Sequence, residues 1–236
     1  MAGRPEPTPR LAQYFTPRPV VAFAFDVLEK LGLGGGPLRV VDPACGDGAF
    51  LLEARRRLPQ AELWGCDLDA RLAERWKEAG LAGPGCHLLA CDGLADAPLF
   101  GLGAGTFDLA VGNPPYGFGV PRPRAAEPVE ALFVRRFADL LRPGGWLAVV
   151  VPEGILANAR CQRLRDGLLA RLSLAAVVAL PETTFAACGT RARTALLFAR
   201  RGQGPRGPVL TASPEGRGEL EDYLADVLRA VETRGE

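Results

Sequence analysis

Short apolar runs alternate with amphipathic segments along most of the chain. The apolar runs contain few polar residues, as strands buried on both faces do. The segments between them repeat apolar residues every three or four positions, which is typical of helices. Strands are predicted at 38–41, 62–66, 87–90, 107–111 and 146–151, and helices at 17–31, 50–58, 70–79, 129–141 and 160–171. This alternation predicts a mostly parallel sheet with helices on both faces.

The pattern changes after the last of these helices. Two predicted strands, 173–180 and 194–200, follow each other with no helix between them. A stretch rich in glycine and proline covers 202–218, and a polar amphipathic helix is predicted at 219–233. We therefore expect one main domain over 1–201, followed by a linker and a C-terminal helix over 202–236.

The composition is that of an ordinary globular protein, with 48% hydrophobic and 23% charged residues among 236. The net charge of +1 does not by itself indicate a nucleic-acid partner. Residues 117–201 nevertheless contain 13 arginines and 6 acidic residues, a surplus of +7. Such a surplus fits a surface that faces phosphates, and it fits equally well the solvated face of a helix.

The six cysteines indicate neither a disulfide framework nor a metal site. They show no CxxC pairing, and Cys86, His87 and Cys91 would need further ligands to hold zinc. Small buried thiols in a reducing cytosol are expected instead, which predicts a cytoplasmic protein without a metal. No signal peptide and no apolar run of membrane-spanning length is visible, so no membrane partner is expected.

Candidate chemistry directly follows four of the predicted strands. These positions meet at the carboxyl edge of a parallel sheet, where open α/β sheets bind ligands. A turn with two glycines, 42–48 (DPACGDG), follows the first strand and lets a ligand approach the backbone closely. Asp67 and Leu68 follow the second strand, Asp92 follows the third, and the turn 113–116 (NPPY) follows the fourth.

Acidic residues at three strand ends favour a nucleoside ligand without a phosphate, because carboxylates repel a pyrophosphate. Asp67 can accept two ribose hydroxyls, Leu68 can pack on an adenine, and Asp92 can accept from the adenine amine. S-adenosylmethionine is such a ligand. Each feature also has a simpler interpretation, since a lone glycine turn is common and an aspartate after a strand is often a helix N-cap, the role we expect for Asp69.

The NPPY turn suits a planar group that carries an amine. Two consecutive prolines fix φ and remove two backbone donors, so the segment is stiff and forms neither helix nor central strand. The Asn113 amide oxygen and a main-chain carbonyl can accept the two amine hydrogens, and the Tyr116 ring can stack on the planar group. Taken alone, the tetrapeptide slightly favours an ordinary loop. Its place at the fourth strand end favours a clamp for a target amine.

Seven runs along the chain resemble, in order, the motifs of the N6-adenine DNA methyltransferases. They are QYFTPRPVVAFAF, VVDPACGDGAF, GCDLD, CDG, GNPPYG, LLRPGGWLAVVVPEGIL and PETTFAACGTRARTALLFARR, which are spread over residues 13–201. The resemblance implies a Rossmann-like class I methyltransferase fold, with a mostly parallel seven-stranded sheet, helices on both faces and an antiparallel C-terminal strand. It also implies S-adenosylmethionine as cofactor and an enzyme that methylates adenine in DNA.

The resemblance implies a role for each matching position. Those expected to close over the methionine end of the cofactor are Gln13, Tyr14, Phe15 and Thr16. Those expected to line its methionine moiety are Asp42, Ala44 and Gly46. Asp67 is expected to hold the ribose, Leu68 to pack on the adenine and Asp92 to bind the adenine amine, and Asn113 is also expected to contact the cofactor. The expected catalytic residues are Asn113, Pro114, Pro115 and Tyr116. Tyr116 and Phe185 would stack on opposite faces of the target base, and Phe133 would border its pocket.

The implied reaction needs no general base before attack. An aromatic exocyclic amine is a poor nucleophile because its lone pair is delocalised into the ring. Two acceptors outside the ring plane can pull the nitrogen toward tetrahedral geometry and direct its lone pair at the sulfonium methyl. The single histidine, His87, follows none of the four strands, in keeping with this mechanism. A base inside a duplex would have to be flipped out.

Two other substrates and one other class of function fit the same motifs. The same chemistry could act on adenine in RNA or on a glutamine amide of a protein. The glutamine enzymes usually carry a helical N-terminal domain, and about 37 residues before the first strand are too few for one. A non-catalytic subunit with a methyltransferase fold is disfavoured because all expected cofactor and target residues are present. DNA is the expected partner, with RNA as the alternative.

No separate target-recognition domain is expected, because 202–236 lacks the bulk to contact a groove. Recognition would then depend on the arginine-bearing loop 117–128, on the surface around Arg160, Arg163 and Arg165, or on a recognition subunit or second copy of the chain. We therefore expect the isolated chain to bind DNA weakly and with little sequence preference. The target sequence and any cognate restriction enzyme stay open.

Overall fold

A computed structural model describes residues 15–95, 101–116, 127–188, 190–202, 209–214 and 219–232. The helices are α1 (Arg18–Lys30), α2 (Ala49–Arg57), α3 (Leu72–Glu78), α4 (Val129–Leu140), α5 (Glu153–Ala157), α6 (Gln162–Leu169) and α7 (Leu220–Glu232). The strands are β1 (Arg39–Asp42), β2 (Glu62–Asp67), β3 (Cys86–Ala90), β4 (Phe107–Gly112), β5 (Leu141–Pro152), β6 (Leu172–Ala179), β7 (Thr194–Arg201) and β8 (Leu210–Ala212). Short 3-10 turns occupy Ala159–Cys161 and Ala186–Cys188.

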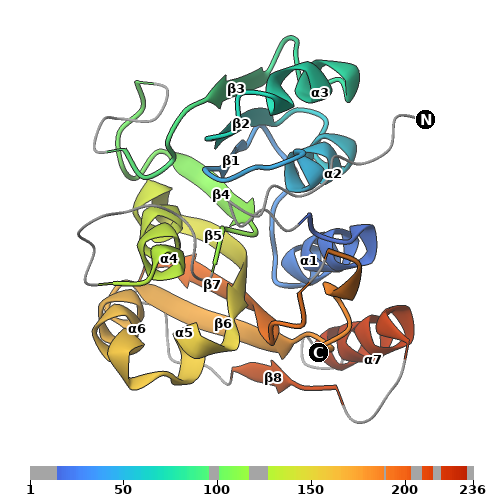
Figure 1. The fold of residues 1–236 in the computed structure, drawn as a ribbon, viewed down its shortest axis with the longest axis vertical. Coiled ribbons are helices and arrows are strands. Elements are labelled where there is room, and N and C mark those ends of the chain that lie inside the picture. The colour runs from blue at the N-terminus through green and yellow to red at the C-terminus, as the bar shows by residue number, and fades with distance from the viewer. Residues whose placement is uncertain are drawn as a thin grey trace.

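The strands form a single eight-stranded sheet in the order β3-β2-β1-β4-β5-β7-β6-β8 (Figure 1). Strands β1 to β5 are parallel to one another, whereas β7 lies antiparallel between β5 and β6. The predicted fold class, with its antiparallel C-terminal strand, is therefore confirmed. Strand β8 pairs parallel to β6 and adds an eighth strand that the sequence pattern did not indicate.

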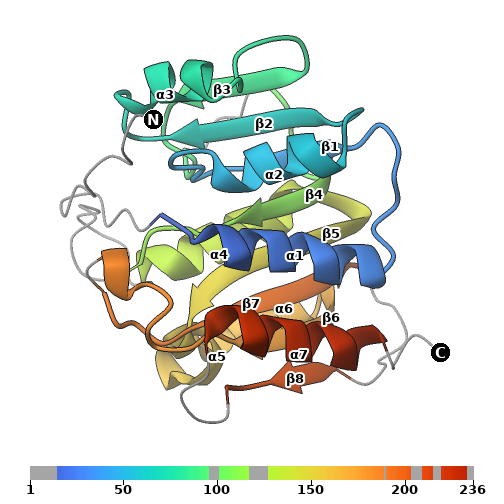
Figure 2. The same ribbon diagram turned by 90° about the vertical axis from the view of Figure 1, so that its right-hand side faces the viewer.

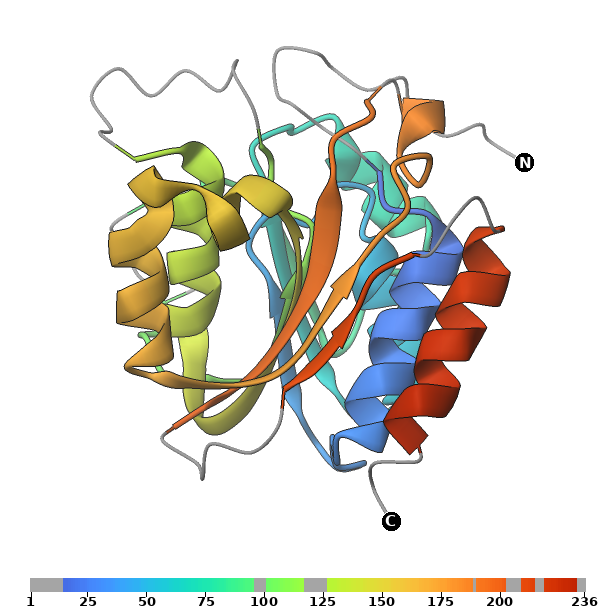
Figure 3. The same ribbon diagram turned by 90° about the horizontal axis from the view of Figure 1, so that it is seen from below.

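Helices cover both faces of the sheet, as the alternating pattern predicts. Figure 3 shows α1, α2, α3 and α7 on one side and α4, α5 and α6 on the other. Each side has its own hydrophobic core, one built around the first group of helices and one around the second. Because both faces of the central strands are buried, the residues free to meet a ligand are those at the strand ends.

The C-terminal helix is part of the first core. Figure 2 shows α7 side by side with α1, and Leu224, Val227 and Val231 are buried between the helices and the sheet. The Tyr223 hydroxyl donates to the Ala179 carbonyl at 2.7 Å, and burial raises the pKa of Tyr223 to about 12. Strand β8 thus extends the sheet and helix α7 packs against it, so both belong to the same fold as the residues that precede them.

Two elements differ from the sequence prediction for local reasons. Strand β5 starts at Leu141 and includes the Arg-Pro-Gly-Gly segment, which lies between the predicted helix 129–141 and the predicted strand 146–151. Gly144 has a φ of +80°, and a Cβ on Gly145 would lie 3.0 Å from the Phe107 carbonyl. Only glycine therefore lets β5 begin this close to the backbone of β4. Helix α5 is too short for its periodicity to be recognised. Within the described ranges, no helix is long and apolar enough to cross a membrane.

Candidate active site

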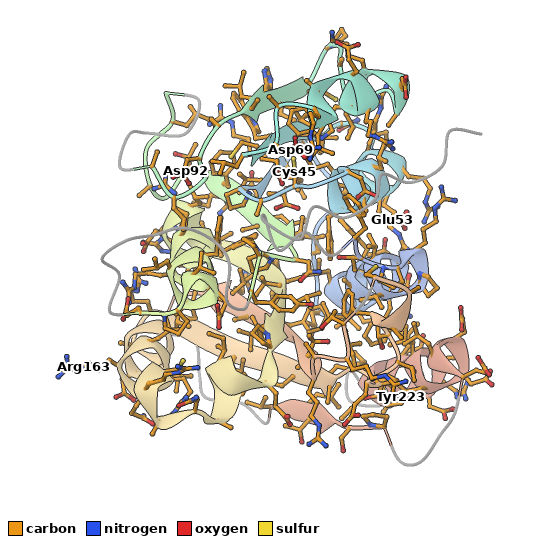
Figure 4. All side chains as sticks on the ribbon, viewed as in Figure 1. Cys45, Glu53, Asp69, Asp92, Arg163 and Tyr223 are labelled. Carbon is orange, nitrogen blue, oxygen red and sulfur yellow. The ribbon has the colours of Figure 1, made fainter. Side chains whose placement is uncertain are left out.

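The turns after β1, β2, β3 and β4 lie next to one another because these four strands are neighbours in the sheet. The predicted convergence of the four strand ends is therefore present in the fold. The Cys45 N–H of the first turn donates to the Cys66 carbonyl of β2 at 2.8 Å, and Figure 4 shows Cys45, Asp69 and Asp92 in the same upper part of the view.

The glycine turn 42–48 is attached to the end of β2 by Asp67. One carboxylate oxygen of Asp67 accepts from the Gly46 N–H at 3.0 Å, and the other accepts from the Asp69 N–H at 3.0 Å. Gly48 has a φ of +82°, and a Cβ there would lie 2.4 Å from Leu81, so the turn cannot hold a larger residue at this position. Asp67 is thus already oriented by the backbone of the glycine turn and of the turn that follows β2.

Asp42 joins the glycine turn to the NPPY turn. Its side chain is only 1% exposed and accepts from the Ala44 N–H at 3.0 Å. A Cβ on Gly112, the residue before Asn113, would lie 2.5 Å from the Asp42 carboxyl, so the two turns touch through this carboxyl group. Burial raises the pKa of Asp42 well above its ordinary value, and the nearby Asp67 and Asp47 raise it further. A positively charged ligand beside Asp42 would favour its ionised form.

We expect Gly112→Ala to destabilise the protein and move the NPPY turn. The added methyl would meet the Asp42 carboxyl at 2.5 Å, so strand β4 or the carboxyl must shift. Such overpacking lowers the free energy of unfolding by about 1–3 kcal/mol, which chemical denaturation would measure. Gly167→Ala is the control, because its Cβ would have no neighbour within 4 Å in helix α6 and should stabilise slightly. Equal free energies of unfolding for the two variants would contradict the close approach of Gly112 to the Asp42 carboxyl.

The end of β3 is fixed against the glycine turn through its backbone. A Cβ on Gly93 would lie 1.9 Å from the Pro43 carbonyl, and the Gly93 carbonyl accepts from Arg136 Nε at 3.1 Å. The neighbouring Asp92 accepts from the Leu94 N–H at 2.9 Å, which orients its carboxylate. Sequence reasoning identified Asp92 but not Arg136, which reaches this turn from α4 across 43 positions of the chain.

The segment before α1 reaches the glycine turn. Phe15 and Thr16 are buried, and the Phe15 ring would lie 3.7 Å from a Cβ on Gly46. The Phe15 carbonyl accepts from the Cys188 thiol at 3.3 Å, so this segment also contacts the turn that carries Phe185. Gln13 and Tyr14 lie outside the described residues, as does most of the arginine-bearing loop.

The aromatic residues expected around the target base are all buried. Tyr116 is 5% exposed and Phe185 is 1% exposed, and Phe133 is buried on α4. Phe133 belongs to the core on the α4 side of the sheet and Phe185 to the core on the α1 side. Stacking of a base on Tyr116 and Phe185 stays a prediction, and it requires these rings to become accessible.

Three other expected or candidate residues have structural partners. Arg165 donates to the carbonyls of Ile155 and Asn158 at 3.0 and 2.8 Å, so it closes the end of α5 instead of facing outward. His87 lies in β3 and stacks on Trp64 with ring centroids 3.9 Å apart, away from the NPPY turn. Asp69 is not the N-cap expected for it, because the N-cap of α3 is Arg71; Asp69 instead accepts from the Arg71 N–H at 3.1 Å in the turn before the helix.

The residues at the carboxyl edge fit S-adenosylmethionine by their chemistry. Leu68 is an apolar side chain that is 57% exposed beside Asp67, which suits a ring packing against it. Asp67 offers oriented acceptors for hydroxyls, and the buried Asp42 suits a positively charged group. These features and the topology define the class of protein: a class I S-adenosylmethionine-dependent methyltransferase. Residues 35–165 match the UPF0020 family model, described as RMKL-like, methyltransferase domain, and the chain belongs to that family.

Similar proteins include methyltransferases named for restriction and for RNA. The chain is 29% identical over 222 residues to the type I restriction enzyme StySPI methylase subunit of Salmonella potsdam, covering 80% of this chain and 40% of that protein. It is 29% identical over 149 residues to the rRNA N(6)-adenosine-methyltransferase metl-5 of Caenorhabditis elegans, covering 61% and 65%. The chain thus spans less than two thirds of the length of these curated relatives.

A solved structure supports the fold. The methyltransferase subunit of a type I restriction-modification system from Streptococcus thermophilus aligns with a TM-score of 0.73 at 20% identity, covering 95% of this chain and 55% of that chain. At this identity the likeness concerns the fold alone.

Proposed function

We propose that this chain transfers the methyl group of S-adenosylmethionine to the exocyclic amine of adenine in DNA. One contact supports the proposal most: the Asp42 carboxyl lies between the glycine turn and Gly112, the residue that leads into NPPY. The side chains suited to the cofactor are therefore adjacent to a turn suited to an amine. Adjacency of this kind is what direct transfer between two bound molecules needs.

The proposed roles follow from the chemistry of each group. Bound S-adenosylmethionine supplies an electrophilic methyl group on a positively charged sulfur. The Asn113 side-chain oxygen and the Pro114 carbonyl accept from the target amine, orienting its lone pair toward that methyl. The Tyr116 ring stacks on the base, and Pro115 keeps the turn rigid. The proton leaves only after the amine has begun to gain the methyl group, so no basic side chain is required.

DNA is preferred over RNA because the similarity to the type I restriction methylase subunit extends over more of the chain than that to the rRNA enzyme. That relative is named as one subunit of a type I restriction enzyme, so a recognition subunit is proposed as a partner of this chain. RNA adenine is the second candidate, favoured by the match to metl-5.

Arg160 and Arg163 are exposed on the surface after β5, and Figure 4 shows Arg163 pointing away from the body of the molecule. These arginines suit contacts with phosphates of either polymer.

A labelling experiment separates these possibilities. The purified chain is incubated with methyl-labelled S-adenosylmethionine and, separately, with duplex DNA, single-stranded DNA, total RNA or protein, and the products are digested and identified by mass spectrometry. We expect N6-methyldeoxyadenosine. Label only in ribonucleosides would establish the RNA alternative, and label only in glutamine the protein alternative. Cofactor binding without transfer to any polymer would make the chain a non-catalytic subunit and refute the proposal.

A further inference from the structure

The backbone of Gly46 is hydrogen-bonded on both sides by side chains from two different elements. Its N–H donates to Asp67 at the end of β2 at 3.0 Å, and its carbonyl accepts from the Trp76 indole of α3 at 2.8 Å. The N–H and the carbonyl of one residue belong to the two peptide planes that meet at its Cα. Fixing both groups therefore fixes φ and ψ of Gly46, which has the left-handed φ of +53°.

This restraint matters because glycine is the most flexible residue. Free glycine populates both signs of φ about equally, so an unrestrained Gly46 would leave the turn with several conformations. A ligand that needs one of them would have to order the turn when it binds, which weakens its affinity. The two hydrogen bonds remove this cost in advance.

Trp76 is well placed to hold the turn. Its side chain is 3% exposed, and the ring would lie 3.8 Å from a Cβ on Gly48, where Leu81 also packs. The same indole therefore hydrogen-bonds the first glycine of the turn and packs behind the second. An indole N–H can only donate, so the bond requires the Gly46 carbonyl to point toward α3. None of the seven motif runs includes Trp76.

We propose that Trp76 is a positioning residue of the cofactor site. It directs the Gly46 carbonyl toward α3, which keeps the Gly46 N–H on Asp67 and presents the glycine turn and the Asp67 carboxylate to the cofactor as one preformed unit. The proposal deepens the assignment of this turn to S-adenosylmethionine and rests on it. Its consequence is an effect on cofactor affinity and not on the methyl-transfer step, because Trp76 lies behind the turn and does not contact the reacting atoms.

The test is Trp76→Phe, which keeps a buried aromatic ring and removes the N–H donor. We expect the dissociation constant for S-adenosylmethionine, measured by calorimetry, to rise about fivefold, the effect of one neutral hydrogen bond. The kcat at saturating cofactor should stay close to that of the wild type. Amide hydrogen exchange of the peptide containing 42–48 should become faster, which reports the turn without any ligand.

Tyr223→Phe is the matched control. It also removes one side-chain donor to a backbone carbonyl, at 2.7 Å, but Figure 4 shows Tyr223 on α7, well away from Cys45 and Asp69. Both variants should lower Tm by a similar amount, and only Trp76→Phe should lower the affinity for the cofactor. Unchanged affinity in Trp76→Phe, or an equal loss in the two variants, would overturn the proposal.

A double-mutant cycle with Asp67→Asn examines the coupling directly. If Trp76 acts by holding Gly46 for Asp67, the affinity losses of the two variants should be less than additive, because each one already frees the same turn. Strictly additive losses would show that the two residues act separately and would contradict the proposal. Failure of the wild-type chain to bind S-adenosylmethionine would refute the cofactor assignment itself, an outcome distinct from failure of the role of Trp76.

Discussion

Asn113→Ala is expected to lower kcat for methyl transfer by at least about 100-fold, as the loss of one preorganised polar group from a reacting centre does. The variant removes the side-chain acceptor proposed for the target amine, and the remaining Pro114 carbonyl cannot orient the nitrogen alone. The turn itself should survive, because both prolines remain and set the backbone. The affinity for S-adenosylmethionine should therefore be nearly unchanged, as measured by calorimetry alongside single-turnover transfer to adenine-containing DNA.

Asn158→Ala provides the control for this prediction. Asn158 precedes the 3-10 turn Ala159–Cys161 and accepts from the Arg160 N–H at 3.1 Å, so its loss removes a capping bond on the surface. The free energy of unfolding should fall by roughly 1 kcal/mol while kcat stays the same. If Asn113→Ala retains full activity, the assignment of the target amine to this turn is wrong. If its kcat falls only as much as cofactor binding does, Asn113 belongs to the cofactor site alone.

The order of elements could be predicted from the sequence because each strand is a short apolar run bounded by turn residues. The strands from β1 to β4 and the helices between them begin and end within about two residues of their predicted limits. The pattern fails where the element is too short to have one, as in the three residues of β8. It also fails where glycine allows a strand to begin in a segment that resembles a helix stop, as at the start of β5.

The candidate site could be located from the sequence but its internal contacts could not. The carboxyl ends of parallel strands meet by topology, so the residues after β1, β2, β3 and β4 could be grouped without a structure. The contacts of Asp42 with Gly112 and of Gly93 with Pro43 join residues far apart in the chain, and no local pattern encodes them. The same is true of Trp76, which reads as one of several apolar positions on an amphipathic helix.

Asp67 is proposed to bind the cofactor, and its backbone contacts show that it also holds the site together. A carboxylate after the second strand is typical of ribose binding, and that pattern says nothing about the protein's own N–H groups. In the structure, both Asp67 oxygens already accept from backbone N–H groups, those of Gly46 and Asp69. Asp67 therefore joins the glycine turn to the turn that follows β2. The residue proposed to bind the ribose is therefore also a residue that builds the site.

Asp67→Ala should consequently lower the affinity for S-adenosylmethionine by more than the loss of a ribose contact alone would lower it. The substitution removes the acceptors for the cofactor hydroxyls and also frees the Gly46 and Asp69 N–H groups, so the turn must be ordered by the ligand. Hydrogen bonds to a charged group contribute about 1.5–3 kcal/mol, which corresponds to a rise of about 10- to 100-fold in the dissociation constant. The kcat at saturating cofactor should be affected far less, the opposite of the result for Asn113→Ala.

Asp108→Ala distinguishes this effect from general destabilisation. Asp108 is also a carboxylate that accepts from a backbone N–H, that of Arg39 at 2.7 Å, and it pairs with Arg142 at the start of β5. It lies near the amino end of β4, whereas Asp67 lies at the carboxyl end of β2, so its removal should lower Tm without changing cofactor affinity. Calorimetric titration and thermal unfolding of both variants provide the comparison. Similar losses of cofactor affinity in the two would mean that Asp67 supports the fold and does not bind the ribose.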